Sequence, residues 1–189
     1  FEHILSSDSE FIVFERNVSD LFFSNVPEGA VAQIAPWSCV EHVRPVLFGI
    51  VSSPGQPIIT CFGVTRLDSR VRDAVWLSGN RARFGDDARG VVLGERAASF
   101  LAAKLGSAVP IGRESFTVVG VIKSANGFED GGVFMPLSAA QEFFHKEGVS
   151  SVATVKLKKK EEKELFRGRV EEEFGFGVGL DQLTGTIIA

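Results

Sequence analysis

Strand and helix patterns alternate at both ends of this sequence of 189 residues, whereas strand patterns dominate its middle. A β-α-β order at the start and a β-α-β-α order at the end indicate one lobe whose sequence is divided by an insertion. The fold class we expect is therefore α+β. Residues 1–44 and 126–189 would form the split α/β lobe, and residues 45–125 would form the inserted β-rich lobe.

The elements at the two ends are predicted from short apolar runs and from helical stripes. For example, Phe166, Val170 and Phe174 recur every four residues, which places them on one side of a helix. The predicted elements are strands over residues 10–15, 31–36, 133–135 and 151–157 and helices over residues 18–25, 138–148 and 159–174.

The middle segment carries β-branched and aromatic residues interrupted by proline and glycine, a pattern typical of strands joined by turns. One amphipathic helix is predicted over residues 95–105, with Gly106 as its C-cap. Residues 112–114 predict the turn of a β-hairpin. The predicted strands lie within residues 39–64 and at residues 75–77, 91–93, 108–111 and 116–123.

Two of the predicted helices carry capping signals at their starts. Ser138 and Gln141 have the spacing of a capping box. Asn17 is expected to cap the helix over residues 18–25, with Asp20 in its first turn. Because loss of an N-cap hydrogen bond destabilises a protein, Ser138→Ala is expected to lower stability by roughly 1 kcal/mol.

Composition and charge exclude several classes of protein. Hydrophobic residues make up 44% and charged residues 23% of the chain, which is the balance of a folded globular protein. The net charge is −4 and the basic residues are scattered, so we expect no nucleic-acid partner. The longest apolar runs, such as residues 118–122, fall far below the roughly 18 residues that a membrane-spanning helix needs. Since no initiator methionine precedes Phe1, we interpret the sequence as a segment of a longer protein.

Cys39 and His42 form the one local pair that resembles a nucleophile and its base. Valines surround both residues, which favours a cysteine that packs as a small hydrophobic side chain. The other histidines, His3 and His145, are far from each other and from His42 in sequence, and none has the spacing of a metal ligand.

Acidic residues and glycines elsewhere in the chain are interpreted as turns. Asp86 and Asp87, with Glu95 and Asp130, lack the alternating acidic spacing of a calcium loop. The glycines in residues 127–132 lack the Gly-Lys-Ser/Thr ending of a phosphate-binding loop. We therefore predict no catalytic residue, no cofactor, no metal and no enzyme activity.

Several aromatic residues are candidates either for the core or for a contact surface. Core packing is the favoured interpretation for each one alone, whereas a cluster left on the surface would mark a binding site. They lie within residues 21–23 and at Trp37, Phe48, Trp76 and Phe84.

Glycine and apolar residues recur in a fixed order between residues 88 and 145. The positions are residues 91–95, Ala98, Leu101, Leu105, Gly106, 109–112, 116–122 and 133–141. In this order and spacing the sequence resembles the MacB-like periplasmic core domain of ABC-transporter permeases, the superfamily of MacB, LolC and FtsX. Residues 11–14 and 34–36 are in the style of the same family, whereas residues 108–110 replace a Gly-Asp stretch that the family usually has.

The resemblance implies an extracytoplasmic, periplasmic domain that projects between the first and second transmembrane helices of a permease subunit. It also implies a split porter-like lobe and an inserted sabre-like lobe, and chain ends at Phe1 and Ala189 that lie on the same side of the molecule. The implied function is to transmit ATP-driven conformational change to a partner or substrate, as in efflux, lipoprotein release or activation of cell-wall hydrolases. The implied partners are a second permease subunit, a cytoplasmic ATPase that is a separate subunit or domain, and a periplasmic adaptor or lipoprotein carrier.

Two other functions compete with this one. A small-ligand sensor or binding domain would need an apolar pocket with a few converging polar groups. A hydrolase would need a polarised Cys39 or a pair of carboxylates. The sequence also leaves open whether Cys39 and Cys61 form a disulfide, because the register between their strands is not encoded in it.

Overall fold

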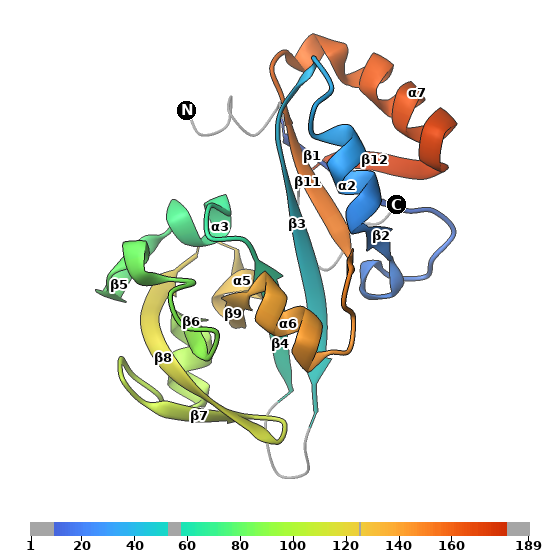
Figure 1. Ribbon diagram of the computed structural model, residues 1–189. Coiled ribbons are helices and arrows are strands. Elements are labelled where there is room, and N and C mark those ends of the chain that lie inside the picture. The colour runs from blue at the N-terminus through green and yellow to red at the C-terminus, as the bar shows by residue number, and fades with distance from the viewer. Residues whose placement is uncertain (1–9, 53–57, 125, 181–189) are drawn as a thin grey trace. The chain divides into compact units, whose positions relative to one another are not determined.

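The structure is a computed structural model that describes residues 10–52, 58–124 and 126–180, and the chain divides into two units (Figure 1). Within the described residues, unit 1 consists of residues 10–46 and 148–180, and unit 2 consists of residues 47–147. Unit 1 is thus built from two pieces of sequence that flank unit 2. The expected placement of Phe1 and Ala189 falls outside the described residues.

Unit 1 contains an antiparallel sheet with the strand order β12-β1-β11-β3. Its strands are β1 (Glu10–Glu15), β11 (Val152–Leu157), β12 (Phe176–Leu180) and the first part of β3 (Val40–Val51). A separate pair of short strands joins β2 (Val26–Pro27) to β10 (Val149–Ser150). The helices of unit 1 are α2 (Glu28–Ile34) and α7 (Lys163–Phe174), with 3₁₀ turns at Leu21–Phe23 and Lys160–Glu162.

Both helices of unit 1 pack on one face of its sheet. Alternate residues of β1 and β11 point to that face, because side chains of a strand alternate between its two sides. The buried cluster contains Phe11, Val13, Ala153, Val155 and Leu157 from the strands, Ile34 from α2, and Phe166 and Val170 from α7. The helical stripe predicted from the sequence is therefore the side of α7 that covers the sheet.

Unit 2 contains a mixed sheet that continues from the last part of β3 in the strand order β4-β9-β6-β8-β5. The β4–β9 and β6–β8 pairs are parallel, whereas β6–β9, β5–β8 and β7–β8 are antiparallel. The strands are β4 (Ile59–Val64), β5 (Val75–Gly79), β6 (Gly90–Gly94), β7 (Ala108–Ile111), β8 (Glu114–Lys123) and β9 (Gly132–Pro136). The helices are α3 (Ser69–Arg72), α4 (Glu95–Phe100), α5 (Gly127–Asp130) and α6 (Leu137–Phe143), with a 3₁₀ turn at Arg81–Arg83.

The core of unit 2 lies between its sheet and helices α4 and α6. The close approach of α6 depends on Gly63, where an added Cβ would lie 2.4 Å from the Cβ of Ala140. Ala97 of α4 is fully buried in the same cluster as Val91 and Leu93 of β6. The α+β fold class is confirmed, and so are the predicted strands at 75–77, 91–93, 133–135 and 151–157 and the hairpin over 108–123.

The prediction for residues 17–36 is wrong. Residues 31–36 belong mostly to helix α2, where Ala30 and Ile34 are buried one turn apart. The helix expected over 18–25 is a 3₁₀ turn of three residues, and its cap is Asp20, which accepts a hydrogen bond from the N–H of Phe22. Asn17 instead adopts a left-handed conformation with φ of 64° before that turn.

The helix expected over 95–105 is shorter than predicted. Helix α4 ends at Phe100, and Ala102 has a positive φ of 51°, which a continuing α-helix does not allow. Gly106 therefore lies in a turn before β7 and is not the C-cap of the helix.

The capping box at Ser138 and Gln141 is wrong as well. Helix α6 starts one residue earlier than expected, its N-cap is Pro136 without a side-chain hydrogen bond, and it ends at Phe143. Ser138 is exposed inside the first turn and Gln141 is buried. The expected loss of roughly 1 kcal/mol for Ser138→Ala therefore has no structural basis.

A side-chain cap is present instead at α5. The Asn126 side chain accepts hydrogen bonds from the N–H groups of Phe128 at 2.8 Å and Glu129 at 3.4 Å. We expect Asn126→Ala to lower the free energy of unfolding by about 1 kcal/mol, because these donors lose their acceptor. Ser138→Ala is the matched control and should leave the thermal midpoint unchanged, so equal effects of the two substitutions would contradict this assignment of the cap.

The boundaries of the two units differ from the expected lobes on both sides of the insertion, and residues 45–46, expected in the inserted lobe, belong to unit 1. The sequence pattern predicts residues 126–147 in the split lobe, yet the division falls after Glu147. The physical reason is pairing: β9 is hydrogen-bonded between β4 and β6, and α6 packs on the same sheet through Ala140. Residues 126–147 therefore belong to unit 2.

Helix length also bears on membrane insertion. The longest helix of the described residues, α7, has 12 residues. Across the residues that the structure describes, none of the helices combines the length and the apolar character needed to cross a bilayer.

Candidate functional site

Cys39, the nucleophile candidate, has the properties of a structural cysteine. Burial raises the pKa of the Cys39 thiol, and the negative charge of Glu162 raises it further; nearby cations and a backbone hydrogen bond offset only part of this. A thiol with a raised pKa is protonated at neutral pH, whereas a nucleophilic cysteine needs a stabilised thiolate. Cys39 and Cys61 are both free thiols, which answers the question of a disulfide.

The two cysteines should differ in reactivity. Burial raises the pKa of Cys61 to about 12, so almost no thiolate is present at pH 8. We expect one thiol per chain to react slowly with a disulfide reagent at pH 8, at Cys39, and the second to react only after urea unfolds the chain. Reaction of Cys39 as fast as free cysteine would contradict its raised pKa.

The four acidic candidates each serve a local structural role. Every one of them binds a cation or a backbone N–H group close to its own turn or strand end. The partners are Arg66 for Asp86, the N–H of Arg89 for Asp87, Lys123 for Glu95 and the N–H of Ser124 for Asp130. In the described part of the chain, no three His, Cys, Asp or Glu side chains lie close enough to hold a metal ion.

A buried ion pair connects α3 to α5 in unit 2. The Arg70 guanidinium donates to both carboxylate oxygens of Asp68, at 3.0 and 2.9 Å, and the two side chains are only 7% and 1% exposed. Glu129 of α5 lies 3.8 Å from the Nε of Arg70 and also accepts a hydrogen bond from Ser124. Asp68 in addition caps α3 by accepting from the N–H of Arg70. This cluster fixes α3, the helix that leads into β5.

Trp76 then fixes β5 on the sheet. Its indole N–H donates to the carbonyl oxygen of Val71 at 2.8 Å. Its ring lies over Gly120 of β8, where an added Cβ would come within 2.1 Å of the ring. Trp76 therefore packs against β8, but it is only partly buried and lies outside the core, so the prediction of core packing is wrong for this residue.

The outward side of β5 is apolar and exposed. Val75 is 62% exposed and Leu77 is 48% exposed, whereas the residues between and after them, Trp76 and Ser78, are partly buried. β5 is the last strand at its end of the sheet, so its second edge has no strand beside it among the described residues. Exposed apolar residues at a sheet edge are typical of a contact surface.

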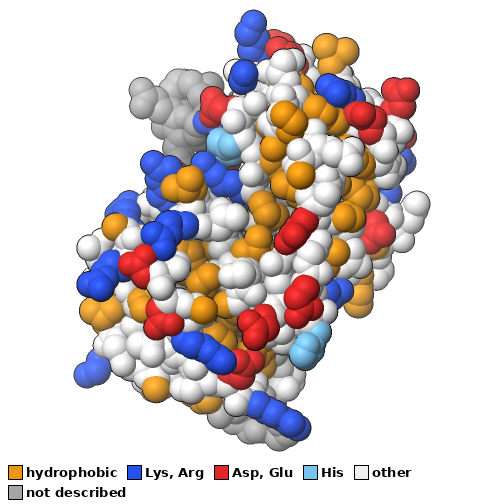
Figure 2. All heavy atoms as spheres, in the orientation of Figure 1, with side chains coloured by type: hydrophobic (Ala, Val, Ile, Leu, Met, Phe, Trp, Pro, Cys, Tyr) orange, Lys and Arg blue, Asp and Glu red, His pale blue; other side chains and the backbone are white. Residues whose placement is uncertain are grey.

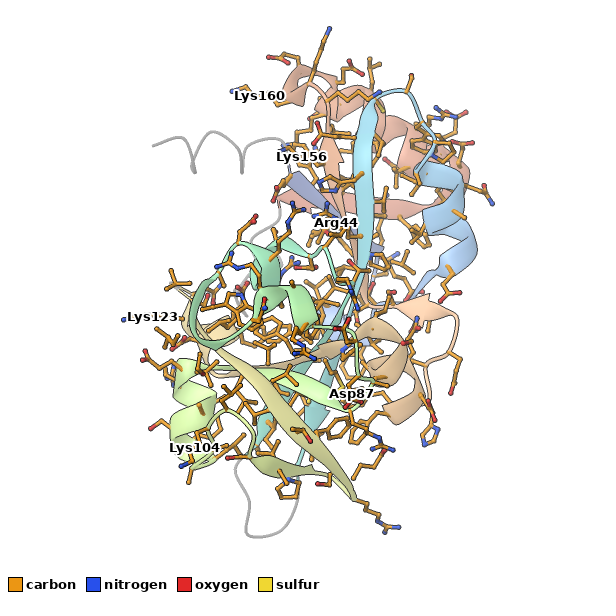
Figure 3. All side chains as sticks on the ribbon, turned by 60° about the vertical axis from the view of Figure 1, so that its left-hand side comes forward. Arg44, Asp87, Lys104, Lys123, Lys156 and Lys160 are labelled. Carbon is orange, nitrogen blue, oxygen red and sulfur yellow. The ribbon has the colours of Figure 1, made fainter. Side chains whose placement is uncertain are left out.

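Basic side chains surround this edge. Residues 66–83 contain five arginines and two aspartates, in a chain whose net charge is −4. Figure 2 shows Lys and Arg side chains gathered where Figure 1 places α3 and β5. Lys123 at the end of β8 points outward in Figure 3 and is in register with Val75 of β5. We call the set of Arg72, Val75, Leu77, Arg81, Arg83 and Lys123 the β5 edge surface.

The sequence indicated only part of this surface. It predicted the strand and singled out Trp76, but it gave no signal that Val75 and Leu77 face outward, because that depends on the position of β5 at the end of the sheet. The other aromatic candidates mostly pack inside: Trp37, Phe48 and Phe84 are buried, whereas Phe23 is exposed.

Comparison with known proteins gives a match to a protein family. A family model described as the MacB-like periplasmic core domain matches residues 1–173. A comparison with curated proteins finds no match.

The solved structures that are similar to the chain include two domains of transporters. The periplasmic region of MacB from Actinobacillus actinomycetemcomitans has a TM-score of 0.66 and 17% identity, over 90% of this chain and 87% of that chain. The extracellular domain of the noncanonic ABC-type transporter YknZ from Gram-positive bacteria has a TM-score of 0.66 and 15% identity, over 91% of this chain and 98% of that chain. At these identities the likeness shows a shared fold.

Proposed function

Because this chain belongs to the MacB-like periplasmic core domain family, we propose that it transmits ATP-driven conformational change from a permease to a partner or substrate outside the cytoplasm. The observation that carries the proposal is the family match over residues 1–173. The division of unit 1 into two pieces of sequence around unit 2 supports it. In this proposal unit 1 is the split porter-like lobe and unit 2 is the inserted sabre-like lobe.

The proposed role is mechanical and needs no catalytic side chain. Transmission of motion requires units that keep their own structure while they move. The buried cluster of unit 1 and the ion pair between Asp68 and Arg70 in unit 2 give each unit such internal support. The partners in the proposal are a second permease subunit, the ATPase on the cytoplasmic side, and an extracytoplasmic adaptor or lipoprotein carrier, in efflux or lipoprotein release.

Distance measurements in the full-length permease test the proposal. A spin label attached at Gln33→Cys, an exposed position of α2, reports the distance between two copies in the dimer; Cys39→Ser removes the half-buried native thiol. We expect the distance distribution to shift between the nucleotide-free state and a state trapped with ATP. A permease whose ATPase cannot bind ATP is the control and should show no shift. An unchanged distribution in a permease that hydrolyses ATP would overturn the proposal.

A further inference from the structure

Strand β5 offers a backbone edge to which another strand can be added. It pairs with β8 on one side, through Val75 with Lys123 and Trp76 with Ile122. Among the described residues it has no pairing on its other side. An unpaired edge presents N–H and C=O groups in the spacing that an extended peptide needs.

The edge is held in place before any partner binds. The indole of Trp76 is hydrogen-bonded to α3, and α3 is fixed in turn by the buried pair of Asp68 and Arg70. The register with β8 shifts between Trp76 and Ser78, so Leu77 lies at a bulge. Bulges at sheet edges re-aim side chains and limit pairing to a short stretch. A partner strand would therefore meet a short, ordered and partly apolar edge.

Charge decides which partner fits. In the described part of the chain, Arg72, Arg81 and Arg83 are exposed and have no carboxylate within ion-pair distance. Lys123 lies 4.0 Å from Glu95, at the limit of an ion pair. A second copy of the chain would bring the same cations against these, and like charges side by side are unfavourable. An acidic partner would be attracted instead.

We propose that the β5 edge surface binds an extended acidic segment of a partner protein, in which apolar and acidic side chains alternate, by adding it as a strand to β5. The apolar side chains of the segment cover Val75 and Leu77, and its carboxylates face Arg72 and Arg83. The inference rests on the proposed function in that it names the chemistry of the extracytoplasmic partner.

Peptide binding to the 189-residue chain tests the inference. The probe is a short capped peptide in which glutamate and valine alternate, and the readout is NMR chemical shift and amide exchange of residues 75–79. We expect saturable binding, with shifts centred on β5 and slower amide exchange there. A peptide in which lysine replaces glutamate should not bind. A glutamate-valine peptide N-methylated at every amide should not bind either, because it has lost the backbone donors on both edges of a strand.

Charge-reversal variants provide the matched comparison. Arg72→Glu with Arg83→Glu should weaken binding at least about tenfold. Lys104→Glu with Arg113→Glu makes the same change of charge at exposed positions outside the β5 edge surface and should leave binding unchanged. Circular dichroism of both double variants verifies that they remain folded.

Three results would overturn the inference: no change at residues 75–79, equal binding of the N-methylated peptide, or equal loss of affinity in the two double variants. These outcomes are independent of nucleotide. If the peptide binds but the spin-label distance does not change with nucleotide, the proposed transmission of motion is rejected and the inference stands. If the distance changes but the peptide does not bind, the inference alone is rejected.

Discussion

Replacing Arg70 with methionine should lower the free energy of unfolding of unit 2 by about 3–5 kcal/mol. The reason is that the Asp68 carboxyl, whose side chain is 1% exposed, would lose its buried cation partner and two of its hydrogen bonds. Methionine retains much of the aliphatic volume of arginine, so the loss reports charge and hydrogen bonding more than a cavity. The loss of free energy of unfolding is measured by urea unfolding, followed by tryptophan fluorescence. The measurement uses a Trp37→Phe background, in which Trp76 of unit 2 is the remaining tryptophan.

The control for Arg70→Met is Arg113→Met, an exposed arginine in the turn between β7 and β8. It should change the stability by less than about 0.5 kcal/mol. Combining Arg70→Met with Asp68→Asn should recover part of the loss, because the buried charge is then removed together with its partner. A loss in Arg70→Met no larger than in the control would show that the buried pair does not support α3.

Strands of the core were predictable because their signal is local. The apolar runs of β1, β6 and β9 are bounded by charges, prolines or glycines, and most residues of each run are buried in the structure. Burial of a continuous apolar stretch does not depend on which strand lies beside it. These strands therefore appear where the sequence places them.

Residues 31–36 show where local signals fail. Their apolar residues suit a strand as well as a short helix. The helix α2 forms because Pro27 occupies its N-cap and because Ala30 and Ile34 are buried against the sheet. A short apolar run is ambiguous in this way whenever packing is what selects the conformation. The same reason applies to Ser138, whose capping spacing is overridden because α6 begins directly after Pro136.

The β5 edge surface depends on contacts between residues distant in sequence. The sequence predicted β5 itself, yet the exposure of its edge follows from the order β6-β8-β5, in which the chain adds β8 between two earlier strands. The support of α3 likewise comes from Glu129, which is far from Arg70 in the chain. No spacing rule in a single sequence identifies such pairs, so the surface could be only partly predicted.

Gly94→Ala should lower the free energy of unfolding of unit 2 by about 3 kcal/mol. Gly94 ends β6 and caps α4 with an ordinary φ of −64°, so the cost arises from space and not from backbone conformation. An added Cβ would lie 2.1 Å from the carbonyl oxygen and 2.7 Å from the Cα of Asp130. These are backbone atoms of α5, which no side-chain rotation can move away.

Relief of that clash requires α5 to shift, and α5 carries both Glu129 of the buried cluster and the Asp130 carboxylate that accepts from Ser124. Gly94→Ala should therefore also raise the amide exchange rate of β5, because α3 loses support from Glu129. Gly168→Ala, in the middle of α7 with nothing within 4 Å of the new Cβ, is the control and should stabilise unit 1 by about 0.5–1 kcal/mol. If the Gly94→Ala chain and the native chain are equally stable, α5 can shift without a cost in free energy. In that case α5 cannot be the support of the β5 edge surface.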